Sequence, residues 1–233
     1  GLSNPQGNHG EDVKELYYYL DSTPTHSFMR MLYKYPHNEY PYSKLLEEGR
    51  RRGKLDREFE LIDTGVFNEN RYFDVEVTYA KGDVNDILMK ITVTNRGNES
   101  ASIDVLPTIW FRNTWDWGYD AYKPEIYLDD KGVMKLNHRQ LGDYYFYCDA
   151  KSEAVFCENE TNTFRLYQHY KEGSFKDGIN DYVVFDHPGT INKIHKGTKA
   201  AFRADWMIEP GQSKVLRVRL APKYFAKPFQ QFA

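Results

Sequence analysis

The stretch TIWFRNTWDWGYD, residues 108–120, contains three of the four tryptophans of the chain, interleaved with Arg112, Asn113 and Asp116. A strand buried on both faces would not carry these polar residues so densely, because each of them needs a polar partner. Indole rings beside such donors and acceptors are what a sugar ring or a polar domain interface requires. The residue types leave two interpretations open, a core strand or a surface for a sugar or a protein partner.

The alternation of side chains along a strand divides this stretch into two parts. On a regular strand Trp110 shares one face with Arg112, and Phe111 shares the other face with Asn113. We therefore expect Trp110 and Phe111 to finish a strand and residues 112–118 to form a loop.

Two pairs of carboxylates could in principle act as acid and base on a glycosidic bond, which needs one carboxyl group on each side. These pairs are Glu11 with Asp12 and Asp116 with Asp120. Adjacent residues of an extended chain point in opposite directions, so the first pair needs a bend to face one bond. Charged residues make up 28% of the chain, so carboxylates beside aromatic residues are common. We expect neither pair to be catalytic.

Other catalytic and ligand-binding motifs are missing from the sequence. It contains no nucleophile elbow, zinc-protease, phosphate-loop or dinucleotide motif, and its seven histidines are scattered. We expect no cofactor and no metal. The two cysteines, Cys148 and Cys157, are predicted to be buried free thiols on one hairpin rather than a disulfide.

Charge and hydropathy narrow the class of protein. The formal net charge is -3, and no concentrated basic patch for nucleic acid or an anionic membrane is present. No apolar run approaches the ~20 residues of a membrane span, and no leader opens the chain. We expect a soluble cytoplasmic protein, with the periplasm as the alternative.

The elements that must position these residues are predicted to be strands. Aromatic residues reach 16%, and several segments alternate between apolar and polar residues. The predicted strands include 59–67 and 71–82 joined as a hairpin at 68–70, 86–97, 101–111 with a bulge or an edge position at Pro107, 125–129, 133–138, 144–149, 154–159, 163–168, 182–185, and a long hairpin over 199–222. This pattern predicts an all-β fold, a large antiparallel β-sandwich.

The first 58 residues differ from the rest. They are rich in turn formers and charge, so we expect an irregular extension with one short helix over Tyr42–Arg52, followed by a sandwich domain over residues 59–233. Phe225, Phe229 and Phe232 near the end of the chain are predicted to pack on a neighbouring domain, as expected for a fragment.

Long motifs in the first half resemble glycoside hydrolase family 63-like proteins, bacterial relatives of processing α-glucosidase I. The motifs occupy residues 4–42, 60–81, 91–97 and 106–118, and a looser similarity continues through 208–220. The resemblance implies a galactose mutarotase-like super-β-sandwich followed by an (α/α)6 barrel that carries the catalytic Asp and Glu of an inverting enzyme. The present chain has no helical repeat that could form this barrel, so no catalytic residue carries over.

By the same resemblance, some sandwich loops approach the active-site entrance of the barrel. The candidate substrate-rim or domain-interface residues are Asn8, His9, Glu11, Asp12, Lys14, Arg112, Asn113, Trp115, Asp116 and Trp117.

Three functions follow as hypotheses. The first is a non-catalytic sandwich domain whose partners are the barrel of the same protein and an oligosaccharide with α-linked glucose. The second is an independent carbohydrate-binding module with Trp115 and Trp117 as its platform. The third is a mutarotase-like epimerase, which needs a histidine facing a carboxylate. The isolated domain is also expected to self-associate.

Overall fold

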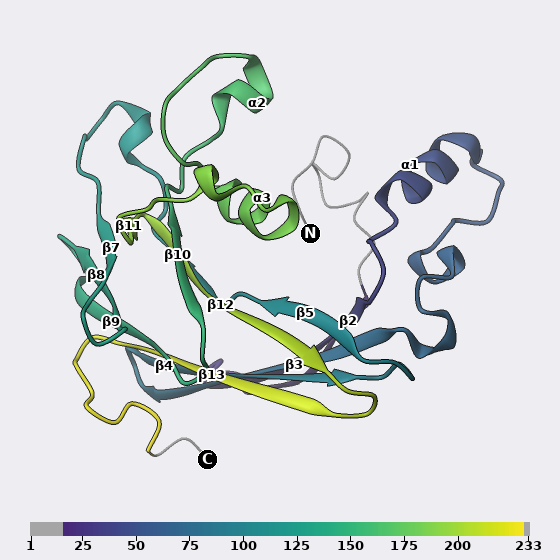
Figure 1. Ribbon diagram of the computed structural model, residues 1–233, viewed down its shortest axis with the longest axis horizontal. Coiled ribbons are helices and arrows are strands. Elements are labelled where there is room, and N and C mark those ends of the chain that lie inside the picture. Colours follow the sequence, from purple (N-terminus) through teal and green to yellow (C-terminus); the bar gives the residue numbers. More distant parts are fainter. Residues whose placement is uncertain (1–15, 231–233) are drawn as a thin grey trace. The chain divides into compact units, whose positions relative to one another are not determined.

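The computed structural model describes residues 16–230, and these residues are mostly β-structure (Figure 1). The strands are β1 (Leu16–Ser22), β2 (Phe28–Pro36), β3 (Tyr72–Asp83), β4 (Asp86–Asn95), β5 (Ala101–Val105), β6 (Thr108–Trp110), β7 (Glu125–Leu128), β8 (Met134–His138), β9 (Gly142–Cys148), β10 (Glu153–Cys157), β11 (Lys196–Gly197), β12 (Lys199–Ile208) and β13 (Ser213–Ala221). The α-helices are α1 (Tyr42–Arg51), α2 (Thr163–Tyr167) and α3 (Gly178–Phe185). No helix in this part of the chain is long and apolar enough to cross a membrane.

The strands form large antiparallel sheets, which confirms the predicted fold class. Within residues 16–230, the larger sheet has the order β1-β2-β3-β4-β13-β9-β8-β7-β11, and the smaller has the order β10-β12-β5, with β6 also paired to β12. The chain divides into two compact units. The first contains the residues up to Ala80, Lys90–Ile103 and Met207–Val215, and the second contains Lys81–Met89, Asp104–Trp206 and the residues from Leu216 onward.

In the first unit, β1, β2 and β3 form antiparallel pairs, and α1 packs beside a 3-10 turn at Leu61–Thr64. Leu45 of α1 is buried with Leu61 and Val66 in a small apolar cluster. The helix over residues 42–51 is confirmed, but the expectation of an irregular extension is wrong for residues 16–36. This segment is a hairpin of β1 and β2. Its second strand is held by hydrogen bonding to nine successive residues of β3, a long-range contact that the local sequence does not indicate. The boundary at residue 58 stays a prediction.

In the second unit the two sheets face each other. Phe146 of β9 and Phe202 of β12 are both buried, and their ring centroids lie 5.5 Å apart. Helix α3 lies against β10, where Ile179 packs on Val155 and Cys157 (Figure 1). These contacts build the core from which the tryptophan stretch emerges.

Three predicted strands are helical turns instead. Residues 59–67 and the proposed connection at 68–70 form 3-10 turns, in which the Asp63 side chain accepts the N–H of Glu60. Residues 163–168 form α2, whose first turn is capped by the Asn162 side chain. Residues 182–185 belong to α3, because a run of four apolar residues does not distinguish a strand from a buried helix.

Two predicted hairpins are also wrong. The strands β12 and β13 lie where expected and are joined by a turn with Gly211 at φ 70°, but they belong to different sheets. The same holds for β9 and β10, which carry Cys148 and Cys157. Both connections cross from one layer of the sandwich to the other. The single strand predicted over residues 101–111 is interrupted at Pro107, since β5 ends before it and β6 begins after it.

Both cysteines are free thiols, as predicted. Burial is the main cause that raises the pKa of Cys157 to about 12, and it also raises the pKa of Cys148. Because the thiolate is the reactive form, we expect iodoacetamide at pH 8 to leave Cys157 unmodified in the native protein. Mass spectrometry after labelling with and without denaturant checks this, and rapid native labelling of Cys157 would contradict it.

Candidate functional site

The tryptophan stretch begins in the second unit as strand β6, which ends at Trp110, one residue before the predicted end at Phe111. The first residue beyond the strand is fixed through both of its backbone groups. The Phe111 N–H donates to the carbonyl of Thr198 at 2.9 Å, and the Asn159 side chain donates to the Phe111 carbonyl at 2.8 Å. Residues 112–118, named the tryptophan loop here, therefore start from a rigid base.

The tryptophan loop is closed by its own polar residues. The Asn113 side chain donates to the Asp116 carboxylate at 2.7 Å and accepts the Asp116 N–H at 3.2 Å. This pair stabilises a 3-10 turn over Trp115–Trp117, which ends at Gly118 in the left-handed conformation with φ 79°. The Arg112 guanidinium lies over the ring of Trp117, 5.1 Å from its centroid.

A buried carboxylate holds the loop from beneath. The Glu160 side chain is only 8% exposed and lies just beyond the end of β10. Its Oε1 accepts Trp115 Nε1–H at 2.9 Å and Lys123 Nζ at 2.7 Å, while Oε2 accepts Lys171 Nζ at 2.6 Å. Three segments distant in sequence therefore meet at one carboxylate.

These contacts decide the ionisation state of Glu160. Burial would raise the pKa of this carboxyl, but the hydrogen bonds from Lys123, Lys171 and Trp115 outweigh burial and lower the pKa to about 2. Burial would also lower the pKa of Lys123, yet Glu160 and Glu158 raise it above its ordinary value. Glu160 is thus a permanent anion at neutral pH and cannot serve as a general acid.

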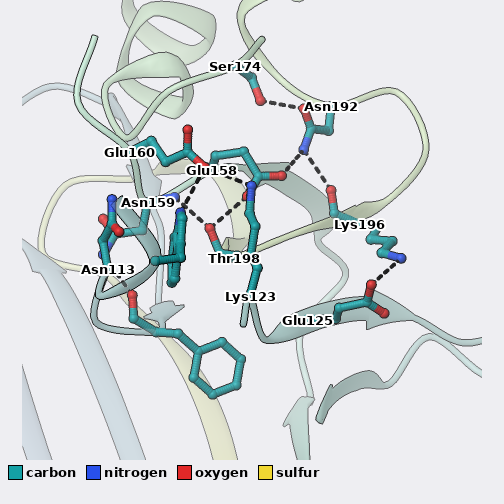
Figure 2. Close-up of polar contacts among 12 residues, drawn as sticks. Asn113, Lys123, Glu125, Glu158, Asn159, Glu160, Ser174, Asn192, Lys196 and Thr198 are labelled. Atoms are coloured by element: carbon teal, nitrogen blue, oxygen red, sulfur yellow. Dashed lines mark hydrogen bonds and ion pairs between the residues drawn. The ribbon is translucent and has the colours of Figure 1, made fainter. Parts of the chain in front are cut away.

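A continuous polar network lies beneath the tryptophan loop, and in it Lys123 pairs with the carboxylates of both Glu158 and Glu160 (Figure 2). Lys123 Nζ lies 2.9 Å from Glu158, whose carboxylate also accepts the Thr198 hydroxyl at 2.8 Å. The Thr198 hydroxyl in turn accepts the Asn159 N–H at 2.7 Å. The network satisfies polar groups that would otherwise be costly beneath the loop, so its role is to fix the loop.

Asn113, Asp116 and the Trp115 indole therefore have partners within the protein, whereas several rings in the loop and next to it point to solvent. Trp110 is 58% exposed, Trp117 is 53% exposed, and Tyr119 is 90% exposed. A fixed loop that presents exposed aromatic rings can bind a flat or apolar surface at a low cost in conformational entropy.

The predicted site residues are only partly brought together. Arg112 contacts Trp117, and Asn113 contacts Asp116, but Trp115 turns inward to Glu160. The predicted residues Asn8, His9, Glu11, Asp12 and Lys14 lie outside the described residues.

The second carboxylate pair is split between two sets of partners. Asp116 is bonded to Asn113, and Asp120 is paired with Arg139 and accepts the Tyr122 N–H. The hydrogen bond and charge of Arg139 lower the pKa of Asp120. Asp120 is therefore not poised to take up a proton near neutral pH.

The residues that fix the loop from beneath were not among the predicted site residues. The missed residues are Lys123, Glu158, Glu160, Lys171 and Thr198. One signal was available, since Glu158 and Glu160 follow an apolar strand at a spacing of two and so share a side of an extended chain. No cluster of three or more potential ligands that could hold a metal occurs in residues 16–230.

A pocket of about 300 Å³ lies at the same strand end. Ile109, Trp110 and Phe111 line it together with His138 and other residues of the second unit. The Phe111 ring stacks on the His138 imidazole with centroids 5.4 Å apart.

No family model matches the chain. The chain is similar to the uncharacterized protein YMR196W of Saccharomyces cerevisiae, with 34% identity over 257 residues that cover 94% of this chain. That match covers 24% of the yeast protein, so the chain spans about a quarter of the length of the curated relative it matches.

Among solved structures, an X-ray structure of a galactose mutarotase-related enzyme from Lactobacillus acidophilus matches 88% of this chain and 70% of that chain. The identity is 10% and the TM-score is 0.33, and from a match of this size we carry over no residue role, activity or substrate. The chain is therefore a mostly β protein related in sequence to a part of a longer yeast protein.

Proposed function

We propose that this chain is the non-catalytic β-sandwich domain of a glycoside hydrolase of the family 63-like, inverting α-glucosidase type. Its role is to support the catalytic (α/α)6 barrel of the same protein and to line the substrate entrance with the tryptophan loop. The observation that carries the proposal is the contrast between the bonded polar groups and the exposed aromatic side chain of this loop. Asn113 and Asp116 bond to each other and the Trp115 indole bonds to Glu160, while Trp117 remains exposed on a fixed backbone.

Two further findings support this proposal. The chain spans about a quarter of the yeast relative, which leaves room for a catalytic domain in a protein of that length. The carboxylates of the loop region are paired with cations or amides, as expected for residues that shape a surface. The motif resemblance supplies the family, the barrel and the α-linked glucose substrate.

Hydrolysis assays test the proposal directly. The 233-residue chain is expected to release no glucose from α-linked disaccharides, whereas the full-length protein should hydrolyse them. In the full-length protein, Trp117→Ala is expected to raise KM or weaken the domain contact, and Ile194→Ala serves as a control because Ile194 is exposed outside the loop and does not line the neighbouring pocket. Robust turnover by the isolated chain would overturn the proposal.

The hypothesis of an independent carbohydrate-binding module with Trp115 and Trp117 as its platform is less well supported. Its platform needed Trp115 and Trp117 side by side at the surface, but the Trp115 indole is bonded to buried Glu160. The epimerase hypothesis needs a histidine facing a carboxylate. His138 lines the pocket beside the loop, and no carboxylate is among the described residues that line it.

Self-association of the isolated domain remains part of the proposal. Tyr17, Tyr18, Tyr19 and Leu20 of β1 are each at least 45% exposed, and β1 stands at the end of the larger sheet's strand order. Exposed edge strands with apolar side chains favour pairing with another chain. Light scattering should show dimers or larger species at high concentration that Tyr19→Lys reduces, and a clean monomer throughout would contradict this expectation.

A further inference from the structure

The pocket beside the tryptophan loop combines aromatic and polar side chains, and it has no role in the proposed function. Its volume of about 300 Å³ is at the small end of the range for ligand sites, which suits one ring-sized ligand. All its lining residues belong to the second unit.

One wall of the pocket is aromatic and open to solvent. Trp110 lines it and is 58% exposed, and Phe111 lies next to it, held by the stack with His138. An exposed indole in a concave site offers a flat face for the C–H side of a saturated ring.

The polar groups around the pocket are few. They are Asn85, Tyr144 and His138, and no Asp, Glu, Lys or Arg is among the described lining residues. The N–H groups of Gln140 and Leu141 both donate to His138 Nδ1 at 3.2 Å, which places the proton of the neutral ring on Nε2. Within residues 16–230, His138 Nε2, the Asn85 amide and the Tyr144 hydroxyl have no protein hydrogen-bond partner, so all three can serve a ligand.

We propose that this pocket binds a neutral hexopyranose, with one face of the sugar ring on Trp110 and its hydroxyls on Asn85, Tyr144 and His138. A charged ligand would find no countercharge there, and a ligand without hydroxyls would leave the three polar groups unpaired. This site goes beyond the proposed function, because it lies on the sandwich itself and needs no barrel.

Titration of the whole 233-residue chain with methyl α-D-glucopyranoside, followed by NMR, tests the proposal. Saturable binding in the millimolar range is expected, with shifts at the Trp110 indole. Trp110→Ala should weaken binding about tenfold or more, because it removes the aromatic face. Tyr170→Ala is the control, since this exposed ring belongs neither to the pocket nor to the tryptophan loop, and it should leave the affinity unchanged.

Tyr144→Phe and Asn85→Ala keep the proposal testable if Trp110→Ala fails to fold. Each removes one polar group and should weaken sugar binding several-fold while leaving cyclohexylmethanol binding unaffected. Absence of saturable sugar binding, or equal binding of cyclohexylmethanol and the sugar, would overturn the assignment. These outcomes are independent of the hydrolysis assay, so the failure of one proposal does not decide the other.

Discussion

Replacing Glu160 by glutamine is expected to lower the free energy of unfolding by about 3 kcal/mol at pH 7. Glutamine keeps the shape of the side chain but removes the charge that Lys123 and Lys171 share, and it turns one acceptor into a donor facing a cation. This change in the free energy of unfolding agrees with the pKa of Glu160 in the folded protein, since a fall of the pKa from 4.5 to about 2 corresponds to about 3 kcal/mol.

Urea denaturation monitored by circular dichroism measures this change. Glu172→Gln is the matched control, because it removes the same charge from an exposed position next to Lys171. The control should change the stability by about 0.5 kcal/mol or less. Equal stability of the Glu160 and Glu172 variants would contradict the anchoring role of Glu160.

The same group predicts how stability depends on pH. The folded-state pKa of Glu160 is lower than the unfolded value, so its contribution is complete above pH 4.5 and is lost as the pH falls through about 2. The native protein should therefore lose more stability between pH 4.5 and 2 than the Glu160→Gln variant. Parallel stability curves for the two proteins in this range would refute the prediction.

Replacing Asp86 by leucine is expected to destabilise the protein by about 3–5 kcal/mol. Asp86 and Arg219 are 7% and 8% exposed, and two hydrogen bonds of 2.9 and 2.6 Å join the carboxylate to the guanidinium. Phe225 covers the guanidinium, with its ring centroid 3.5 Å from the central carbon. Removal of the carboxylate leaves a buried cation without its countercharge.

A double variant separates loss of the pair from loss of packing. Asp86→Leu with Arg219→Met should recover most of the lost stability, because no uncompensated charge remains in the interior. Glu125→Leu breaks the half-exposed pair with Lys196 and should cost about 1 kcal/mol or less. If the double variant is no more stable than Asp86→Leu, the charge is not the cause.

The Arg219 pair also changes how the C-terminal segment is understood. The sequence analysis placed Phe225 and its neighbours on another domain. In the structure, Phe225 covers Arg219, its N–H donates to the Tyr147 hydroxyl at 2.8 Å, and Arg219 donates to the Pro228 carbonyl at 2.8 Å. From the sequence alone, Arg219 on an alternating strand is expected at the surface, because its buried partner Asp86 is 133 positions away.

The sequence by itself determined local features of the strands. The alternation in residues 86–97 and 199–222, an irregularity at Pro107 and the end of a strand within one residue of Trp110 follow from side-chain periodicity and from the missing N–H of proline. The tertiary structure alone decided which strands share a sheet, because a turn such as the one at Gly211 fits a hairpin and a crossing between layers equally well.

The tertiary structure also decided the role of TIWFRNTWDWGYD. Composition left its tryptophans open between core and surface, and the structure divides them, with Trp115 turned to Glu160 and Trp117 exposed. The direction of each indole depends on Lys123, Glu160 and Lys171, which lie 8 to 56 positions away from Trp115 in the sequence. A charge pair over such a separation leaves no periodic trace in the sequence, so only the folded chain reveals it.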